Sequence, residues 1–299
     1  MTSEAVDIDV ELVRKLVRAS FPQWSDLGIA PVPDSGWDNR MFRLGREMVV
    51  RLPGSAGFAV GNEREQRWLP VIAPALTQPI PLPLAVGEPA FGYPWRWSVY
   101  RWLAGETALP GRIGSMVEFA RELAAFLRSL HTIPGTGGPP AGVESFHRGG
   151  ALAAYDGDIR RAIAALRSQM DAETMTAVWD RALASHWAAP PVWVHGDVGV
   201  GNLLVADGRL CGVIDFGQCC VGDPACDLVP AWTLFDGESR AVFRGALAMD
   251  ADTWARGRGW ALWKAAIVAA GMCTTNAWEG TRSQTTIDQV IADFLRDRR

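Results

Sequence analysis

Basic residues are scarce in this sequence. Its 299 residues include 29 Lys plus Arg against 33 Asp plus Glu, and the formal net charge is −4. Only Lys15 and Lys264 are lysines. Nucleic acids and anionic membranes are bound through a concentrated positive field, which this composition does not supply. The composition therefore argues against nucleic-acid and membrane partners and favours a small molecule.

A long apolar run is also missing. The longest one, around residues 260–273, is interrupted by Lys264 and is too short to cross a bilayer. The first ten residues, MTSEAVDIDV, lack the basic and apolar regions of a secretion signal. We therefore expect a cytoplasmic protein, either a monomer or a weak dimer.

Cysteine is present in an odd number, five, which does not suit a disulfide framework. Four cysteines fall close together and raise the question of a metal site, but their spacing does not match paired C-x-x-C knuckles. Free cysteine behaves as a small hydrophobe, so buried reduced thiols are expected at these positions: Cys211, Cys219, Cys220 and Cys226.

The residues that are present, 48% hydrophobic and 21% charged, describe a globular chain with a sizeable core. The first hundred residues predict a helix from Asp9 to Arg18, a hairpin around Gly45, a helix over residues 58–75 and a strand at 97–103. Later segments predict mainly helices, at 114–131, 150–166, 172–187 and after Asp223, where Asp and Pro resemble a helix start. The Gly/Pro-rich segment 132–150 predicts a loop.

One stretch in the helical half, VHGDVGVGNLLVADGRLCGVIDFG at residues 194–217, gathers acidic and amide side chains. The turn Asp207-Gly208 between two apolar runs predicts a β-hairpin, whose open end would bring Asn202 and Asp215 together. Amide and carboxylate oxygens suit Mg²⁺, which takes further ligands from phosphate. Asp197 would remain available for proton transfer. Ordinary turn carboxylates bonded to backbone N–H groups are the alternative.

The spacing H-x-D-x-x-x-x-N, followed thirteen residues later by D-F-G, matches the catalytic loop and metal-binding aspartate of kinases. Together with GDPACDL, SGWDNRMFRLG, VVRLP, EREQRWLP and SVYRWLAGE, it resembles the aminoglycoside phosphotransferase family, which is related to choline kinases and macrolide phosphotransferases. The resemblance covers nearly the whole chain. It implies an α+β, two-lobed protein-kinase-like fold, with a β-rich nucleotide-binding lobe at 1–102 and a mainly helical catalytic and acceptor-binding lobe at 103–299.

By this resemblance, Asp197 would be the catalytic base, and Asn202 and Asp215 would hold Mg²⁺ on the phosphates of ATP or GTP. His195 would orient the loop as a hydrogen-bonded structural histidine, and Asp227 would brace it. The other three histidines, His131, His147 and His186, fall in segments elsewhere, so the set is too poor for a metal-dependent hydrolase.

The expected nucleotide-binding lobe departs from the kinase pattern, because kinases carry a lysine on the third strand and neither lysine of this chain falls there. Arg51 takes that position, and arginine grips phosphate oxygens through parallel N–H donors. Glu65 is the expected partner of Arg51, with Glu63 as the alternative. The remaining expected nucleotide contacts are the loop residues Ser35 and Asn39, the hinge residues Arg101, Trp102 and Leu103, and the apolar residues Leu204 and Ile214 beneath the base.

The short distance from Asp215 to the GDPACDL motif leaves no room for the peptide-binding segment of a protein kinase, so a small-molecule acceptor is expected. An aminoglycoside-type antibiotic is the first expectation from the resemblance. From Asp223 onward the numbers of acidic and basic residues nearly balance. A macrolide or another hydroxylated metabolite therefore remains an alternative acceptor. A non-catalytic nucleotide-binding module is a further alternative. Several tryptophans in the helical half, including Trp260 and Trp263, predict either core packing or an aromatic acceptor site.

Overall fold

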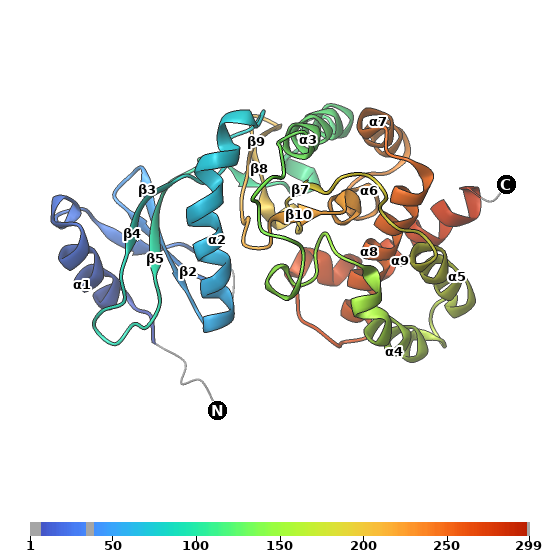
Figure 1. Ribbon diagram of the computed structural model, residues 1–299, viewed down its shortest axis with the longest axis horizontal. Coiled ribbons are helices and arrows are strands. Elements are labelled where there is room, and N and C mark those ends of the chain that lie inside the picture. Colours follow the sequence, from blue (N-terminus) through green and yellow to red (C-terminus); the bar gives the residue numbers. More distant parts are fainter. Residues whose placement is uncertain (1–6, 34–38, 298–299) are drawn as a thin grey trace. The chain divides into compact units, whose positions relative to one another are not determined.

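The computed structural model describes residues 7–33 and 39–297, which form two compact units (Figure 1). The first unit consists of Met1–Ala104 together with Gly212–Gln218, and the second of Gly105–Cys211 and Cys219–Arg299. The chain therefore leaves the first unit near the division expected at residue 102, and a seven-residue segment containing Asp215 later groups with that unit.

The first unit is built on a five-stranded antiparallel sheet with the strand order β1-β2-β3-β5-β4. The expected hairpin forms from β2 and β3, and Gly45 takes a positive φ of 59° in its turn. Glycine adopts this backbone region without steric cost. The strands are β1 Ile29–Pro31, β2 Asn39–Leu44, β3 Met48–Pro53, β4 Pro83–Gly87 and β5 Trp97–Arg101.

Two helices cover opposite faces of this sheet, α1 Val10–Ser20 and α2 Ala56–Ile72 (Figure 1). Successive side chains of a strand point to opposite faces. Val50 and its neighbour Val99 belong to the apolar core that includes α1, whereas Arg51, between Val50 and Leu52, faces α2. One face is therefore a hydrophobic core, and the other carries polar side chains. Asp9 caps α1 through its Oδ1, 2.7 Å from the Leu12 N, as the sequence predicted.

The second unit is mainly helical and is organised around α8 Ala251–Ala269. Side chains are buried around nearly the whole circumference of this helix, which is typical of a central helix. Helices α4, α5 and α9 all pack against it. The other helices of this unit are α3 Met116–His131, α4 Asp156–Leu166, α5 Ala172–Leu183, α6 Pro230–Thr233, α7 Gly237–Leu247 and α9 Ala277–Asp297.

Short strands complete the second unit. One ribbon pairs β7 with β10, and one sheet has the order β6-β8-β9. The strands are β6 Glu106–Thr107, β7 Val192–Val194, β8 Leu203–Ala206, β9 Arg209–Val213 and β10 Cys220–Gly222. Short 3₁₀ turns occur in both units. In the first unit they lie at Pro22–Trp24 and Ala73–Ala75, and in the second at Pro110–Arg112, Val143–Ser145, Leu152–Tyr155, Val200–Asn202 and Pro224–Leu228.

The helix start expected at Asp223 forms in a shortened version. Asp223 Oδ1 accepts a hydrogen bond from the Ala225 N, at 3.0 Å, as a cap would. The element that follows is a five-residue 3₁₀ turn rather than an α-helix. A second proline, Pro230, comes six residues after Pro224 and has no N–H to continue a helix, so the chain restarts there as α6.

Candidate active site

The polar face of the first unit centres on Arg51. Its Nη1 donates to both carboxylate oxygens of Glu65, at 2.8 and 2.6 Å, and its Nη2 donates to Asp215 Oδ1 at 2.8 Å. Glu65 on α2 is therefore the carboxylate that pairs with Arg51, while Glu63 is exposed. The guanidinium thus joins a strand, a helix and the Asp-Phe-Gly segment within one unit.

Glu65 is fully buried and collects further hydrogen bonds. The phenol of Tyr100 donates to its Oε2 at 2.8 Å, and the backbone N of Phe216 donates to its Oε1 at 2.8 Å. Burial raises the pKa of the Glu65 carboxyl, against the opposing effect of the Arg51 charge. Glu65 therefore fixes Phe216, and with it the direction of the preceding Asp215.

Asp215 occupies a left-handed backbone conformation, with φ of 65°. Its side chain is 33% exposed, and Arg51 engages only Oδ1. Gly217 approaches α2 closely, because a Cβ added at Gly61 would meet the Gly217 carbonyl oxygen at 3.1 Å. The Asp-Phe-Gly segment is thus held against α2, with one carboxylate oxygen of Asp215 left to contact other groups.

In the second unit, Asp197 lies on the loop after β7, and this loop is held by Asp227. The buried Asp227 carboxylate accepts from the backbone N of His195 at 3.0 Å and from that of Gly196 at 2.8 Å. His195 Nδ1 then accepts from the Asp197 N at 3.1 Å. These bonds fix the backbone at Asp197. The supporting roles expected for His195 and Asp227 stay predictions.

Asn202 lies at the end of the same loop. Its Nδ2 donates to the Asp197 carbonyl oxygen at 2.9 Å and approaches Asp197 Oδ2 at 3.3 Å. This contact fixes the orientation of the amide, and no described residue donates to its Oδ1. The amide oxygen of Asn202 and the Oδ2 of the Asp215 carboxylate, which Arg51 leaves free, are hard oxygen donors, so the chemistry of these groups fits Mg²⁺.

The predicted hairpin is present as β8 and β9. Asp207 and Gly208 both take positive φ values, 51° and 77°, as a type I′ turn requires. The turn is packed closely, since a Cβ at Gly208 would lie 2.9 Å from the Gly114 N. Asn202 precedes this hairpin in the second unit, and Asp215 follows it in the first. Their sharing of one cation stays a prediction.

The expected nucleotide contacts fall at several places in the described chain. Ser35 lies outside the described residues, and Asn39 is buried at the start of β2. In the expected hinge, the Arg101 N donates to the Leu82 carbonyl oxygen and the Trp102 N to that of Glu47, at 3.1 and 2.7 Å. Among described residues, the Leu103 N has no recorded hydrogen-bond partner.

The structure also shows the surroundings of the expected hinge side chain Trp102 and of the two apolar residues expected beneath the base. The Trp102 ring stacks under the guanidinium of Arg43, whose Cζ lies 4.1 Å from the ring centroid. Leu204 is buried on β8, and Ile214 is partly buried directly after β9. Their expected position beneath the base stays a prediction.

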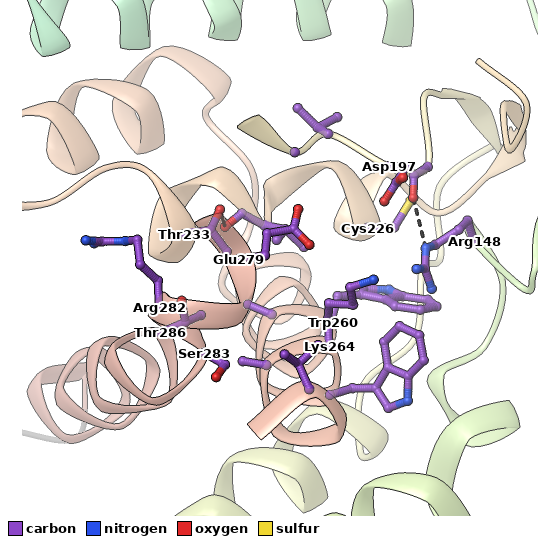
Figure 2. A pocket seen from close by; sticks show the side chains of 18 of the residues that line it. Arg148, Asp197, Cys226, Thr233, Trp260, Lys264, Glu279, Arg282, Ser283 and Thr286 are labelled. Carbon is purple, nitrogen blue, oxygen red and sulfur yellow. Dashed lines mark hydrogen bonds between the residues drawn. The ribbon is translucent and has the colours of Figure 1, made fainter. Parts of the chain in front are cut away.

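A pocket in the second unit borders the loop that carries Asp197, as Figure 2 shows. Asp197 and Arg148 line it on one side, and Trp260 and Lys264 come from α8. The Arg148 Nε donates to the Gly196 carbonyl oxygen at 2.9 Å, so a residue of the Gly/Pro-rich segment 132–150 holds the loop that carries Asp197. Sequence reasoning missed Arg148, because nothing in a glycine- and proline-rich loop indicates a contact 48 positions away.

His131 is a second residue whose place the sequence did not reveal. Sequence reasoning put it on a helix elsewhere, yet its Nε2 lies 3.2 Å from Asp227 Oδ2. The two residues are 96 positions apart, and only the packing of α3 brings them together. Asp227 is therefore contacted by both a histidine side chain and the backbone of the loop that carries Asp197.

The cysteines form no disulfide among the described residues. Cys219, Cys220 and Cys226 are buried as expected, whereas Cys211 is partly exposed. Burial raises the pKa of the Cys226 thiol well above its usual range. Within residues 7–33 and 39–297, no group of three or more His, Cys, Asp or Glu side chains is arranged to hold a metal ion.

Comparison with known proteins places this geometry in a family. A sequence model of the phosphotransferase enzyme family matches residues 29–260, which is most of the chain. The chain belongs to the phosphotransferase enzyme family. A curated relative, an aminoglycoside 3′-phosphotransferase of Escherichia coli, is 29% identical over 153 residues. This match covers 47% of the chain and 53% of the relative, so it spans about half the length of that protein.

Solved structures of phosphotransferases share the fold, which confirms the expected two-part, kinase-like architecture. The GDP complex of wild-type aminoglycoside 2′-phosphotransferase-IIIa superposes with a TM-score of 0.68 at 17% identity, covering 96% of this chain and 100% of that one. A macrolide 2′-phosphotransferase from Brachybacterium faecium gives 0.60 at 20% identity, covering 94% and 98%. None of the described helices is long and apolar enough to cross a membrane.

Proposed function

We propose that this phosphotransferase-family protein moves the terminal phosphoryl group of ATP or GTP to a hydroxyl group of a small molecule. The observation that carries the proposal is the bridge that Arg51 makes between Glu65 and Asp215. The buried carboxylate of Glu65 holds the guanidinium of Arg51 beside the partly exposed carboxylate of Asp215. Kinases likewise pair a phosphate-binding cation with a helix glutamate and place a metal-binding aspartate in the Asp-Phe-Gly segment, so the arrangement supports the proposal.

The relatives support both substrates of the proposed reaction. Two of the similar structures are a GDP complex and an ADP complex of aminoglycoside phosphotransferases, and another contains streptomycin and ATP. A nucleotide donor and a hydroxylated acceptor are therefore natural expectations for this chain. Mg²⁺, held by Asn202 and Asp215, would supply charge neutralisation on the phosphates.

Individual residues of the chain would have distinct roles in the transfer. Arg51 would face the phosphate oxygens with its positive charge while Glu65 holds its position. Asp197 would accept the proton of the acceptor hydroxyl as the oxygen attacks phosphorus, and the bond from phosphorus to the leaving nucleotide oxygen breaks. His195 and Asp227 would keep the Asp197 backbone in place through the bonds described above. Most of the rate enhancement would come from positioning and charge.

Nucleotide turnover tests the proposal. The full-length protein with Mg²⁺ and either ATP or GTP is incubated with a panel of aminoglycosides, macrolides and other alcohols, and release of nucleoside diphosphate is measured. We expect acceptor-dependent release, and a loss of about 10²–10⁴-fold in Asp197→Asn, because a positioned base contributes that factor. Tight binding of Mg-nucleotide with no transfer to any acceptor would instead indicate a non-catalytic nucleotide-binding module.

A further inference from the structure

The pocket beside Asp197 is rich in positive charge. Three cationic side chains line it: Arg148, Lys264 and Arg282. Only two carboxylates do so, Asp197 and Glu279. An acceptor with several ammonium groups would need acidic partners, because a charge taken out of water must be compensated by an opposite charge. The described residues of this pocket instead include more cationic than acidic side chains.

Within the described residues, no Asp or Glu forms an ion pair with Arg148, Lys264 or Arg282. Arg148 is only 8% exposed, and its Nη1 is buried without a hydrogen-bond partner among these residues. A buried donor without a partner costs free energy, so it gains from an oxygen atom on a ligand.

Three tryptophan rings form another part of the wall. The Arg148 guanidinium lies over the rings of Trp260 and Trp263, 5.1 and 4.7 Å from their centroids. Arg282 lies in the same way over Trp278, at 4.8 Å. The pocket has a cavity volume of about 60 Å³ and is partly open to solvent.

We propose that the acceptor is an alcohol with an apolar body and an anionic oxygen group, such as a carboxylate, rather than a polycation. The anionic group would contact Arg148 and Lys264, the apolar body would pack on the tryptophan rings, and the hydroxyl would face Asp197. This inference rests on the proposed function, because it names the acceptor class for the same site. It also assigns Arg148 and Lys264 as specificity-determining residues.

Binding of three matched probes tests the proposal. The probes are phenyllactate, its primary amide, and the amine in which a CH₂–NH₃⁺ group replaces the carboxylate. Calorimetric titration of the full-length protein, without nucleotide, gives a dissociation constant for each. We expect the acid to bind about tenfold more tightly than the amine, with the amide between them, as a charge-assisted contact would produce. Equal binding, tighter binding of the amine, or no binding of the acid would overturn the proposal.

Lysine variants connect this preference to the pocket. Lys264→Met should bring the acid and the amine to within about threefold of each other, since it removes one contact of the anion. Lys264 makes no ion pair with a described carboxylate, so the variant should fold. Lys15→Met is the matched control, because the only other lysine is exposed on α1. An unchanged preference in Lys264→Met would contradict the assignment.

The two proposals fail in different ways. Phenyllactate and other hydroxy acids are therefore added to the acceptor panel described above. If kanamycin is phosphorylated at least as efficiently as each of these hydroxy acids, the acceptor class is wrong while the phosphotransferase activity stands. If no alcohol of any charge is phosphorylated by the wild type, the proposed function fails, whatever the order of binding of the three probes.

Discussion

Arg51 donates from one nitrogen to both carboxylate oxygens of Glu65, and neither side chain is more than 10% exposed. Removing one partner of such a pair leaves a buried charge without compensation. Arg51→Met should therefore lower the free energy of unfolding by about 3–5 kcal/mol, measured by urea denaturation. Arg96→Met is the control, because its ion pair with Glu88 is exposed. Equal effects of both variants would contradict a buried, structurally important pair.

The pH dependence of stability should report the pKa of Glu65, which burial raises above the ordinary value of 4.5. A raised carboxyl pKa means that the folded state binds the proton more tightly, so stability falls as pH rises from 4.5 to the pKa of the folded protein. Glu65→Gln cannot titrate. The wild type should therefore lose stability relative to Glu65→Gln across this interval, measured by urea denaturation at several pH values. A relative gain would show that the pKa is lowered.

Asp227→Ala tests how the loop that carries Asp197 is supported. It leaves the backbone N–H groups of His195 and Gly196 buried without their acceptor, at a cost of about 1–3 kcal/mol for each group. We expect lower stability and lower turnover, with nucleotide affinity close to wild type. Asp227→Asn retains one acceptor oxygen and should be intermediate in both measurements. A change in nucleotide affinity alone would argue against a role in positioning Asp197.

Gly222→Ala tests a close approach of two backbones. A Cβ at Gly222 would lie 2.2 Å from the Gly149 carbonyl oxygen, a distance that forces the two segments apart. We expect a loss of stability of about 1–3 kcal/mol, as other overpacked sites show. Gly245→Ala is the matched control, since Gly245 is exposed on α7 with no atom within 4 Å of the added Cβ. That change should stabilise the protein by about 0.5–1 kcal/mol, and destabilisation by Gly245→Ala would contradict this account.

Features that depend on neighbouring residues were predictable from the sequence. The cap of α1 at Asp9, the β2–β3 hairpin at Gly45 and the Asp207-Gly208 turn all form where local propensity places them. These signals are strong because a turn or cap is decided within about four residues. The candidate site residues Asp197, Asn202 and Asp215 were predicted because their spacing in one stretch of chain matches the layout of kinases, and their roles stay predictions.

Features that depend on distant residues were not predictable in the same way. Arg148 bonds Gly196, and His131 contacts Asp227, across 48 and 96 positions. Neither has a local pattern that distinguishes it from an ordinary surface residue. Glu65 and Glu63 also could not be separated by spacing alone. The choice depends on which face of α2 meets β3, and burial makes that choice for Glu65.

Because Asp227 holds the loop that carries Asp197, this loop can take its final conformation only after residue 227 has been synthesised. The ribosome delivers Asp197 thirty residues before Asp227, so the emerging loop lacks the carboxylate that fixes its backbone. A nascent chain that ends before Asp227 would therefore contain Asp197, Asn202 and Asp215, but the backbone at Asp197 would not yet be fixed. Phosphoryl transfer would become available only when synthesis has passed the GDPACDL segment and the later helices have packed around it.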